Sequence, residues 1–234
     1  MTGDITAVVL DIETANLDMD AEGLSFGNPD GWVVSCVGVH LMGTGQDYVY
    51  VRDYGPVMAQ LLPTEPPYRV FPLAMLAMHM NGWLMRSLPL ITHNGEGFDL
   101  PILAKSLPDG GAGCAEAVSG YADSGLHIDT CARLLSHTGL RIHLSDLCST
   151  LLGSDPSDGK LMPAAEAPIA WSQGRYRQVI DYCIQDCVLT GRVWAAARSS
   201  EPFEVVGHKP GQKRKHRVST EGMSWEPSGS TESK

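Results

Sequence analysis

TAVVLDI, at residues 6–12, is a short run of apolar residues that reaches Asp11 near its end, and Glu13 follows two positions later. A run of this kind is typical of a buried strand that finishes at a functional site. Successive side chains of a strand point to opposite faces, so residues two apart share a face. We therefore expect Asp11 and Glu13 to lie on one face at the end of a core strand.

Two acids on one face of a core strand repel each other and lose hydration, unless a cation lies between them. The alternative is that the strand has already ended and that both side chains are in water. From Asp11 and Glu13 alone, the solvated strand end is the simpler interpretation.

Residues around this strand predict a mixed set of strands and helices. Residues 32–40 (WVVSCVGVH) and 47–53 (DYVYVRD) predict two strands, and the turn residues between them, at 43–45, predict a hairpin. Further strands are expected at 89–93 and 126–129, and helices at 71–87, from about 98 or 99, at 130–136, 143–152 and 173–198. Residues 107–125 and 153–171 are expected to be loops.

This order of elements predicts an α/β fold with a central mixed sheet flanked by helices. Three antiparallel strands followed by a crossover helix into parallel strands resemble the ribonuclease H-like arrangement. Residues 1–200 would form this domain. Residues 201–234 are polar, and we expect a disordered tail with a basic cluster.

Composition indicates an ordinary globular protein of 234 residues, with 43% hydrophobic and 19% charged residues. The N-terminus has no basic stretch before an apolar one, and the apolar segment 70–91 is interrupted by polar residues and prolines. We therefore expect no membrane span, and the six cysteines, without a C-x-x-C pair, favour free thiols in the cytoplasm. Cys183 and Cys187 share a helix face, where packing on a sheet is favoured over half of a zinc site.

The net charge of −10 is unusual for a protein that binds nucleic acid. Residues 209–234 nevertheless hold six Lys and Arg against three Glu, so the excess of acids lies in the rest of the chain. Acids in a metal site are offset by the bound cations, and net charge governs long-range steering without excluding a small nucleic-acid groove.

Two further acids occur later in the sequence, one at the start of a predicted helix and one within another. Asp99 follows HNGEGF at residues 93–98, where the strand 89–93 ends and a helix begins, and an acid in a first helical turn is favourable by itself. Asp186 lies within the predicted helix 173–198, one turn after Tyr182 on the same face. A solvated helix edge and a functional position are equally good interpretations of Asp186 alone.

Carboxylates from several elements are what phosphodiester hydrolysis with two metal ions requires. Two divalent ions about 4 Å apart hold the attacking water and the leaving oxygen. Magnesium takes hard oxygen ligands, so a protein supplies a few carboxylates that converge from different elements.

Taken in order, these residues resemble the motifs of the DEDD superfamily of 3′–5′ exonucleases, in its tyrosine-type branch. The motifs are Asp11-Ile-Glu13-Thr14, Asn94-x-x-x-Phe98-Asp99 and Tyr182-x-x-x-Asp186. The resemblance covers roughly residues 5–198. It is closest to the proofreading exonuclease domain of family B DNA polymerases and to related stand-alone predicted exonucleases. The histidine-type branch places His five residues before the last Asp, where this chain has Asp181.

The resemblance implies that Asp11, Glu13, Asp99 and Asp186 hold two Mg²⁺ or Mn²⁺ ions. It also implies that Tyr182 orients the attacking water, and the hydroxyl's ordinary pKa of about 10 suits positioning better than a full base role. The substrate would be single-stranded or frayed nucleic acid, with DNA favoured, and the product a nucleoside 5′-monophosphate. A larger replication or repair complex is a further expected partner. Residues of the motifs expected near the substrate are Thr14, Asn94 and Phe98, of which Phe98 is also a natural core residue.

Other polar residues have simpler interpretations. His127 and Asp129 suit surface or core roles or support for the site, and Asp146 suits the first turn of a helix behind His143. The basic cluster around Lys209–Arg217 would contact phosphates or remain solvated. A structure-specific endonuclease on the same fold and a non-catalytic nucleic-acid-binding module remain open alternatives. No residue marks a contact to a 2′-OH, so the sequence leaves DNA against RNA open.

Overall fold

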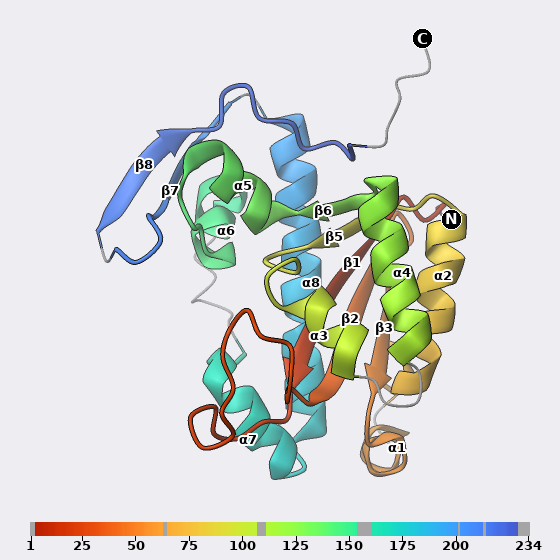
Figure 1. Cartoon of the computed structure of the whole chain (residues 1–234). Helices are drawn as coiled ribbons and strands as arrows, with labels where there is room; N and C mark the ends of the chain where they lie inside the picture. The colour runs from red at the N-terminus through yellow and green to blue at the C-terminus, as the bar shows by residue number, and fades with distance from the viewer. Residues whose placement is uncertain are drawn as a thin grey trace.

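A six-stranded mixed sheet forms the centre of the protein in the computed structural model, which describes residues 3–62, 65–106, 111–153, 161–200, 202–212 and 214–228. The strand order is β4-β3-β2-β1-β5-β6. The strands are β1 (Ala7–Thr14), β2 (Val34–Met42), β3 (Gln46–Val51), β4 (Arg69–Pro72), β5 (Leu90–Thr92) and β6 (His127–Asp129). The predicted α/β class with a mixed sheet flanked by helices is confirmed (Figure 1).

Strand β1 lies between an antiparallel and a parallel neighbour. It pairs antiparallel with β2, which continues through the predicted hairpin into β3, whereas β5 pairs parallel with β1 and β6 parallel with β5. The helices α3 (Asp99–Ser106) and α8 (Tyr176–Ser199) begin near the predicted positions. Because β1 and β5 are parallel neighbours, their carboxyl ends lie at the same end of the sheet, and α3 begins shortly after β5.

The two faces of β1 contact different helices. Val8, Leu10 and Ile12 belong to the core under α2 (Leu76–Met85), α3 and α4 (Gly111–Ser124), while Ala7 and Val9 pack toward α8. Figure 1 shows α3 and α4 in front of the sheet and α8 behind it. Asp11 and Glu13 follow the alternation of Ala7 and Val9, so they face α8.

Gly38 of β2 lies where α8 approaches the sheet closely. A Cβ atom at this residue would lie 2.8 Å from Cys183 Sγ and 3.1 Å from Cys187 Sγ. Both cysteines are fully buried, which confirms the expectation that they pack on the sheet. The small residues on both sides let α8 cross behind β1 and β2.

Several helices were not expected from the sequence. Residues 111–124 form α4 where a loop was predicted, because Cys114, Ala117 and Tyr121 bury one side of this helix against the core. In the predicted loop 153–171, α7 (Ala167–Ser172) follows a short 3₁₀ turn, and residues 154–160 lie outside the described part. Helix α1 (Tyr54–Leu61) and strand β4 were also missed, and β4 replaces the start of the helix predicted at 71–87.

The prediction of a disordered tail was wrong for most of residues 201–234. Strands β7 (Glu204–His208) and β8 (Lys215–Ser219) form an antiparallel hairpin, and Val205 and Trp225 are buried in the cluster that contains Trp194 of α8. Trp194 Nε1 donates a hydrogen bond of 3.0 Å to the carbonyl of Trp225. A few widely spaced apolar side chains bind this polar segment to the domain. Residues 201, 213 and 229–234 lie outside the described part.

Two short helices complete the region between β6 and α8. They are α5 (Thr130–Thr138) and α6 (Leu144–Leu152), both close to the predicted ranges. The segment between them pairs with the C-terminal hairpin, because Arg141 N–H donates to the His208 carbonyl at 2.7 Å and His208 N–H donates to the Arg141 carbonyl at 3.0 Å. The β7–β8 hairpin is thus joined by backbone hydrogen bonds to the α5–α6 connection, and Figure 1 shows it beside α5 and α6.

Candidate active site

The two acids of β1 lie against α8. Asp11 and Glu13 are partly buried, and the thiol of Cys183 donates weak hydrogen bonds to the Asp11 backbone carbonyl at 3.5 Å and to Asp11 Oδ2 at 3.7 Å. Ligand atoms of Asp11, Glu13 and Cys183 all lie within 4.8 Å of one another. The expectation that both acids share one face of a core strand is confirmed.

Asp99 joins this cluster from the first turn of α3. Its side chain is buried, and Oδ1 accepts a hydrogen bond of 3.1 Å from the backbone N–H of Ile12, the residue between the two acids of β1. A buried carboxylate needs such a donor. The bond therefore fixes the start of α3 against the end of β1.

Helix α8 contributes Tyr182 and Asp186, which are one turn apart. Tyr182 is buried, and burial raises the pKa of its hydroxyl, followed by the negative charges of Asp186, Glu13 and Asp11 and by a side-chain hydrogen bond to Asp186. The three carboxylates that act on this hydroxyl come from β1 and α8. Tyr182 is therefore a protonated hydrogen-bond donor and acceptor inside the acidic cluster.

The electrostatics of Asp11 show that all four acids converge. Burial raises its pKa well above the usual range, and so do the neighbouring Cys183 sulfur and the carboxylates of Asp99, Asp186 and Glu13. Burial likewise raises the pKa of Asp99 to about 7, against the lowering effect of its backbone hydrogen bonds. When ionised, these four neighbouring carboxylates repel one another. A divalent cation bound among them would remove this repulsion.

A pocket of about 560 Å³, called here the acidic pocket, opens above these residues. It is lined by every residue that the sequence singled out for the site: Asp11, Glu13, Thr14, Asn94, Phe98, Asp99, Tyr182 and Asp186. Residues from β1, the β5–α3 turn and α8 thus surround one space. This convergence is the geometric condition that motif spacing alone could not establish.

The β5–α3 turn is held by Asp129. Its carboxylate accepts hydrogen bonds of 2.8 Å from the backbone N–H groups of Asn94 and Glu96, and it also caps the start of α5. Asn94 adopts a left-handed conformation with φ of 73°, which this network maintains. Asp129 is 1% exposed and does not line the acidic pocket, so its role is to support the turn.

Aromatic side chains form one wall of the acidic pocket. Phe98 contacts Trp32 edge to face with ring centroids 5.0 Å apart, and Phe26 lies 5.7 Å from Phe98. Phe26 is 73% exposed, which is unusual for so large an apolar side chain. Phe26 and Trp32 belong to no motif, so nothing in the sequence marks them as site residues.

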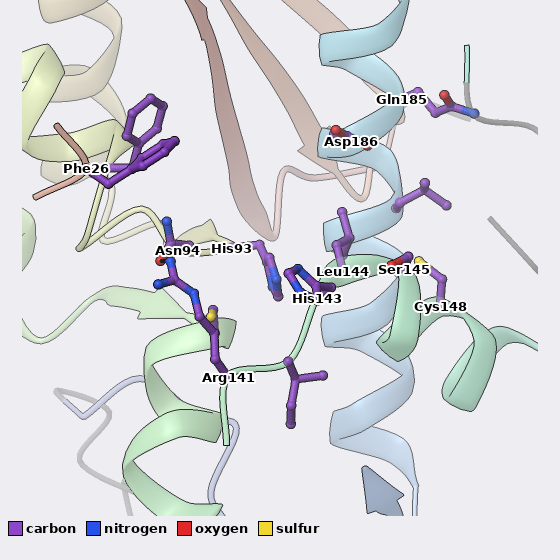
Figure 2. Close-up of a pocket in the computed structure, with 14 residues that line it drawn as sticks. Phe26, His93, Asn94, Arg141, His143, Leu144, Ser145, Cys148, Gln185 and Asp186 are labelled. Carbon is purple, nitrogen blue, oxygen red and sulfur yellow. Dashed lines mark hydrogen bonds between the residues drawn. The ribbon is translucent and has the colours of Figure 1, made fainter. Parts of the chain in front are cut away.

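A second pocket of about 640 Å³, called here the Arg141 pocket, adjoins the acidic pocket and shares Phe26, His93, Asn94, Phe98 and Asp186 with it. Figure 2 shows Arg141 beside Asn94, His93 next to His143, and Asp186 on α8 above them. Arg141 Nη2 donates a hydrogen bond of 2.7 Å to Asn94 Oδ1. Sequence reasoning missed Arg141 because it lies in a connection without a recognisable pattern.

The remaining polar residues have structural partners. His127 Nε2 lies 2.9 Å from Thr92 Oγ1 beneath the sheet edge, and Asp146 pairs with Lys215 of β8 at 3.0 Å. Lys215 and Arg217 of the basic cluster are ordered on β8, where Arg217 pairs with Glu204.

Comparisons with known proteins add no family to this geometry. The chain matches no protein-family model, and a search of curated proteins found no match either. Within the described residues, no helix is both long enough and apolar enough to cross a membrane.

Proposed function

We propose that this protein is a metal-dependent 3′–5′ exonuclease of the tyrosine-type DEDD class, with a ribonuclease H-like sheet. It would hydrolyse single-stranded or frayed nucleic acid, DNA before RNA, to nucleoside 5′-monophosphates, alone or within a replication or repair complex. One observation carries the proposal: four acids and Tyr182, from β1, α3 and α8, converge on the acidic pocket. The antiparallel β1–β2–β3 unit followed by parallel β5 and β6 supports the fold assignment.

The donor set of the acidic pocket fits two Mg²⁺ or Mn²⁺ ions. Asp11, Glu13, Asp99 and Asp186 offer hard carboxylate oxygens, the ligands that these ions prefer. The thiol of Cys183 is also near, but it donates hydrogen bonds to Asp11 and packs on Gly38 behind the strand. When bound, the ions would activate a water and stabilise the charge on the leaving oxygen.

The side chains around the acids have distinct roles in this proposal. Tyr182 would hold the attacking water by a hydrogen bond, since burial and the neighbouring carboxylates keep its hydroxyl protonated. Asn94 and Thr14 would contact the sugar or phosphate of the terminal nucleotide. Phe98, supported by Trp32, would limit the position of the terminal base.

A 5′-labelled oligonucleotide incubated with the protein and Mg²⁺ or Mn²⁺ tests the proposal. We expect a ladder that shortens one nucleotide at a time from the 3′ end, with DNA and RNA, single- and double-stranded, run in parallel. Asp11→Ala and Asp186→Ala should abolish the ladder, whereas Arg69→Gln, which changes an exposed side chain that lines neither pocket, should not.

Three outcomes would contradict this function. Activity that persists in both Asp11→Ala and Asp186→Ala would show that hydrolysis arises elsewhere. Cutting of a circular single strand would identify an endonuclease instead, because a circle has no 3′ end. Absence of any divalent-ion binding in calorimetry would support a non-catalytic nucleic-acid-binding module.

A further inference from the structure

The Arg141 pocket differs in charge from the acidic pocket beside it. Among the described residues that line these two pockets, Arg141 is the only Lys or Arg, and it lines the Arg141 pocket alone. The acidic pocket has four Asp and Glu side chains, whereas the Arg141 pocket has only the shared Asp186 among its described residues. A single side chain therefore provides the permanent positive charge next to the candidate active site.

Arg141 is presented to the pocket in a defined orientation. The side chain is exposed, and its hydrogen bond to Asn94 Oδ1 fixes one edge of the guanidinium at the junction of the two pockets (Figure 2). A guanidinium carries five N–H donors in a plane, and the bond to Asn94 occupies one of them. A planar fork of this kind matches the oxygens of a phosphate group.

The partly buried histidine of the pocket, His93, does not replace this charge. Burial lowers the pKa of His93 to about 4, so it is neutral near pH 7, and its Nδ1 lies 2.8 Å from Thr130 Oγ1. The backbone of Arg141 is held by its two hydrogen bonds to His208 of β7. Both the position and the charge needed for an anion therefore come from Arg141.

We propose that Arg141 binds the phosphate on the 5′ side of the scissile phosphodiester, so that the strand runs from the Arg141 pocket into the acidic pocket. The assignment rests on the proposed function and deepens it. Four carboxylates repel an incoming polyanion wherever bound ions do not neutralise them. A positive charge at the next phosphate on the 5′ side reduces that repulsion. The shared wall of Asn94, Phe98 and Phe26 makes the two pockets continuous for one strand.

Two dinucleotides that differ by one phosphate test this assignment on the full chain. Dithymidine monophosphate (TpT) carries only the scissile phosphodiester, and pTpT carries one further phosphate at its 5′ end. The wild type should hydrolyse pTpT with a kcat/KM about tenfold or more above that for TpT, the size expected for a charge-assisted hydrogen bond. Arg141→Gln should reduce this ratio to about one, whereas Arg141→Lys should keep part of it.

The matched control is Arg69→Gln, which removes one exposed positive charge on β4 from a residue that lines neither pocket. It should keep the wild-type ratio. Raising the salt concentration from about 50 to 200 mM should lower the wild-type ratio, because the extra contact is electrostatic. If Arg141→Gln does not fold, this measurement on the wild type still tests the assignment.

The outcomes separate this inference from the proposed function. A wild type that hydrolyses neither dinucleotide and gives no ladder from the labelled oligonucleotide overturns the proposed function and this assignment with it. A wild type that hydrolyses both with equal kcat/KM, a ratio insensitive to salt, or an Arg141→Gln variant that keeps the ratio overturns the assignment alone.

Discussion

The acidic pocket and the Arg141 pocket share a wall but differ in what they attract. Both use Asn94 and Phe98 of the β5–α3 turn, yet one is surrounded by four acids and the other contains Arg141. The acids come from regular elements that meet at the sheet edge, whereas Arg141 comes from the connection between α5 and α6. The proposed function requires a site for metal ions beside a site for a phosphate. Two adjacent pockets of different charge would meet these two requirements separately.

Asp11→Asn should have the largest effect, because it acts at the centre of the acidic pocket. We expect nuclease activity to fall about 1000-fold, since removing a metal ligand costs several kcal/mol of transition-state stabilisation. The same substitution should raise the melting temperature of the metal-free protein by a few degrees near pH 8. Because the folded-state pKa of Asp11 is raised, folding near pH 8 must either keep its charge beside three other carboxylates or take up a proton, and both destabilise the folded protein.

Hydrolysis assays with Mn²⁺ measure the loss of activity. Melting curves in EDTA measure the rise in melting temperature. Arg69→Gln is the control for both, since Arg69 is exposed on β4 and lines neither pocket. A metal-free Asp11→Asn protein that melts below the wild type would show that Asp11 stabilises the fold without an ion, contrary to our account of the acidic pocket.

Tyr182→Phe separates the positioning of water from the binding of ions. The substitution keeps the buried ring and removes only the hydroxyl, so we expect kcat to fall about 100-fold while KM and Mn²⁺ affinity stay near the wild-type values. Single-turnover kinetics and Mn²⁺ titration measure the two properties. An equal loss of Mn²⁺ affinity would instead make Tyr182 part of the ion-binding set.

Gly38→Ala should disturb the acidic pocket from behind. The new Cβ would lie 2.8 Å from Cys183 Sγ, so β2 and α8 must move apart, at a cost of about 1–3 kcal/mol in the free energy of unfolding. Activity on TpT and pTpT should fall together, because α8 carries Tyr182 and Asp186. Urea unfolding measures the stability.

Gly82→Ala on α2 is the matched control, since the added Cβ would enter open space with no atom within 4 Å. It should leave stability unchanged or slightly raised. A Gly38→Ala protein as stable as the wild type would contradict the close approach of α8 to β2.

Gly207→Ala should disturb the Arg141 pocket and produce the smallest effect on chemistry. The new Cβ would lie 2.6 Å from the Arg141 carbonyl oxygen and 2.7 Å from Ile142 Cγ1. The hairpin must then shift away from the α5–α6 connection. We expect the ratio of kcat/KM for pTpT over TpT to fall severalfold, with TpT hydrolysis less affected. An unchanged ratio would show that the hairpin does not position Arg141.

Local patterns in the sequence predicted most of the central sheet and the residues that line the acidic pocket. Apolar runs gave β1, β2, β3 and β5, and period-two geometry placed Asp11 and Glu13 on one face. Helical periodicity gave α8 and put Tyr182 and Asp186 one turn apart. These predictions succeeded because each depends on residues close together in the chain, and the motif order then indicated which segments would meet.

Features that depend on tertiary packing were missed. Helix α4 is rich in Gly, Ala and Ser, and it is stabilised by burying Cys114, Ala117 and Tyr121 against distant elements. The C-terminal hairpin is polar, and burial of Val205 and Trp225 beside Trp194 orders it. Arg141 acquires its place through backbone pairing with His208, 67 positions later, which no local pattern reveals.

The central claim is that four carboxylates from three elements hold two divalent ions. Anomalous diffraction from crystals of the full chain soaked in Mn²⁺ tests it most directly. Our account predicts two peaks about 4 Å apart among Asp11, Glu13, Asp99 and Asp186, and their loss in Asp11→Asn crystals. Mn²⁺ bound only elsewhere, or no peak in the acidic pocket at saturating Mn²⁺, would contradict it.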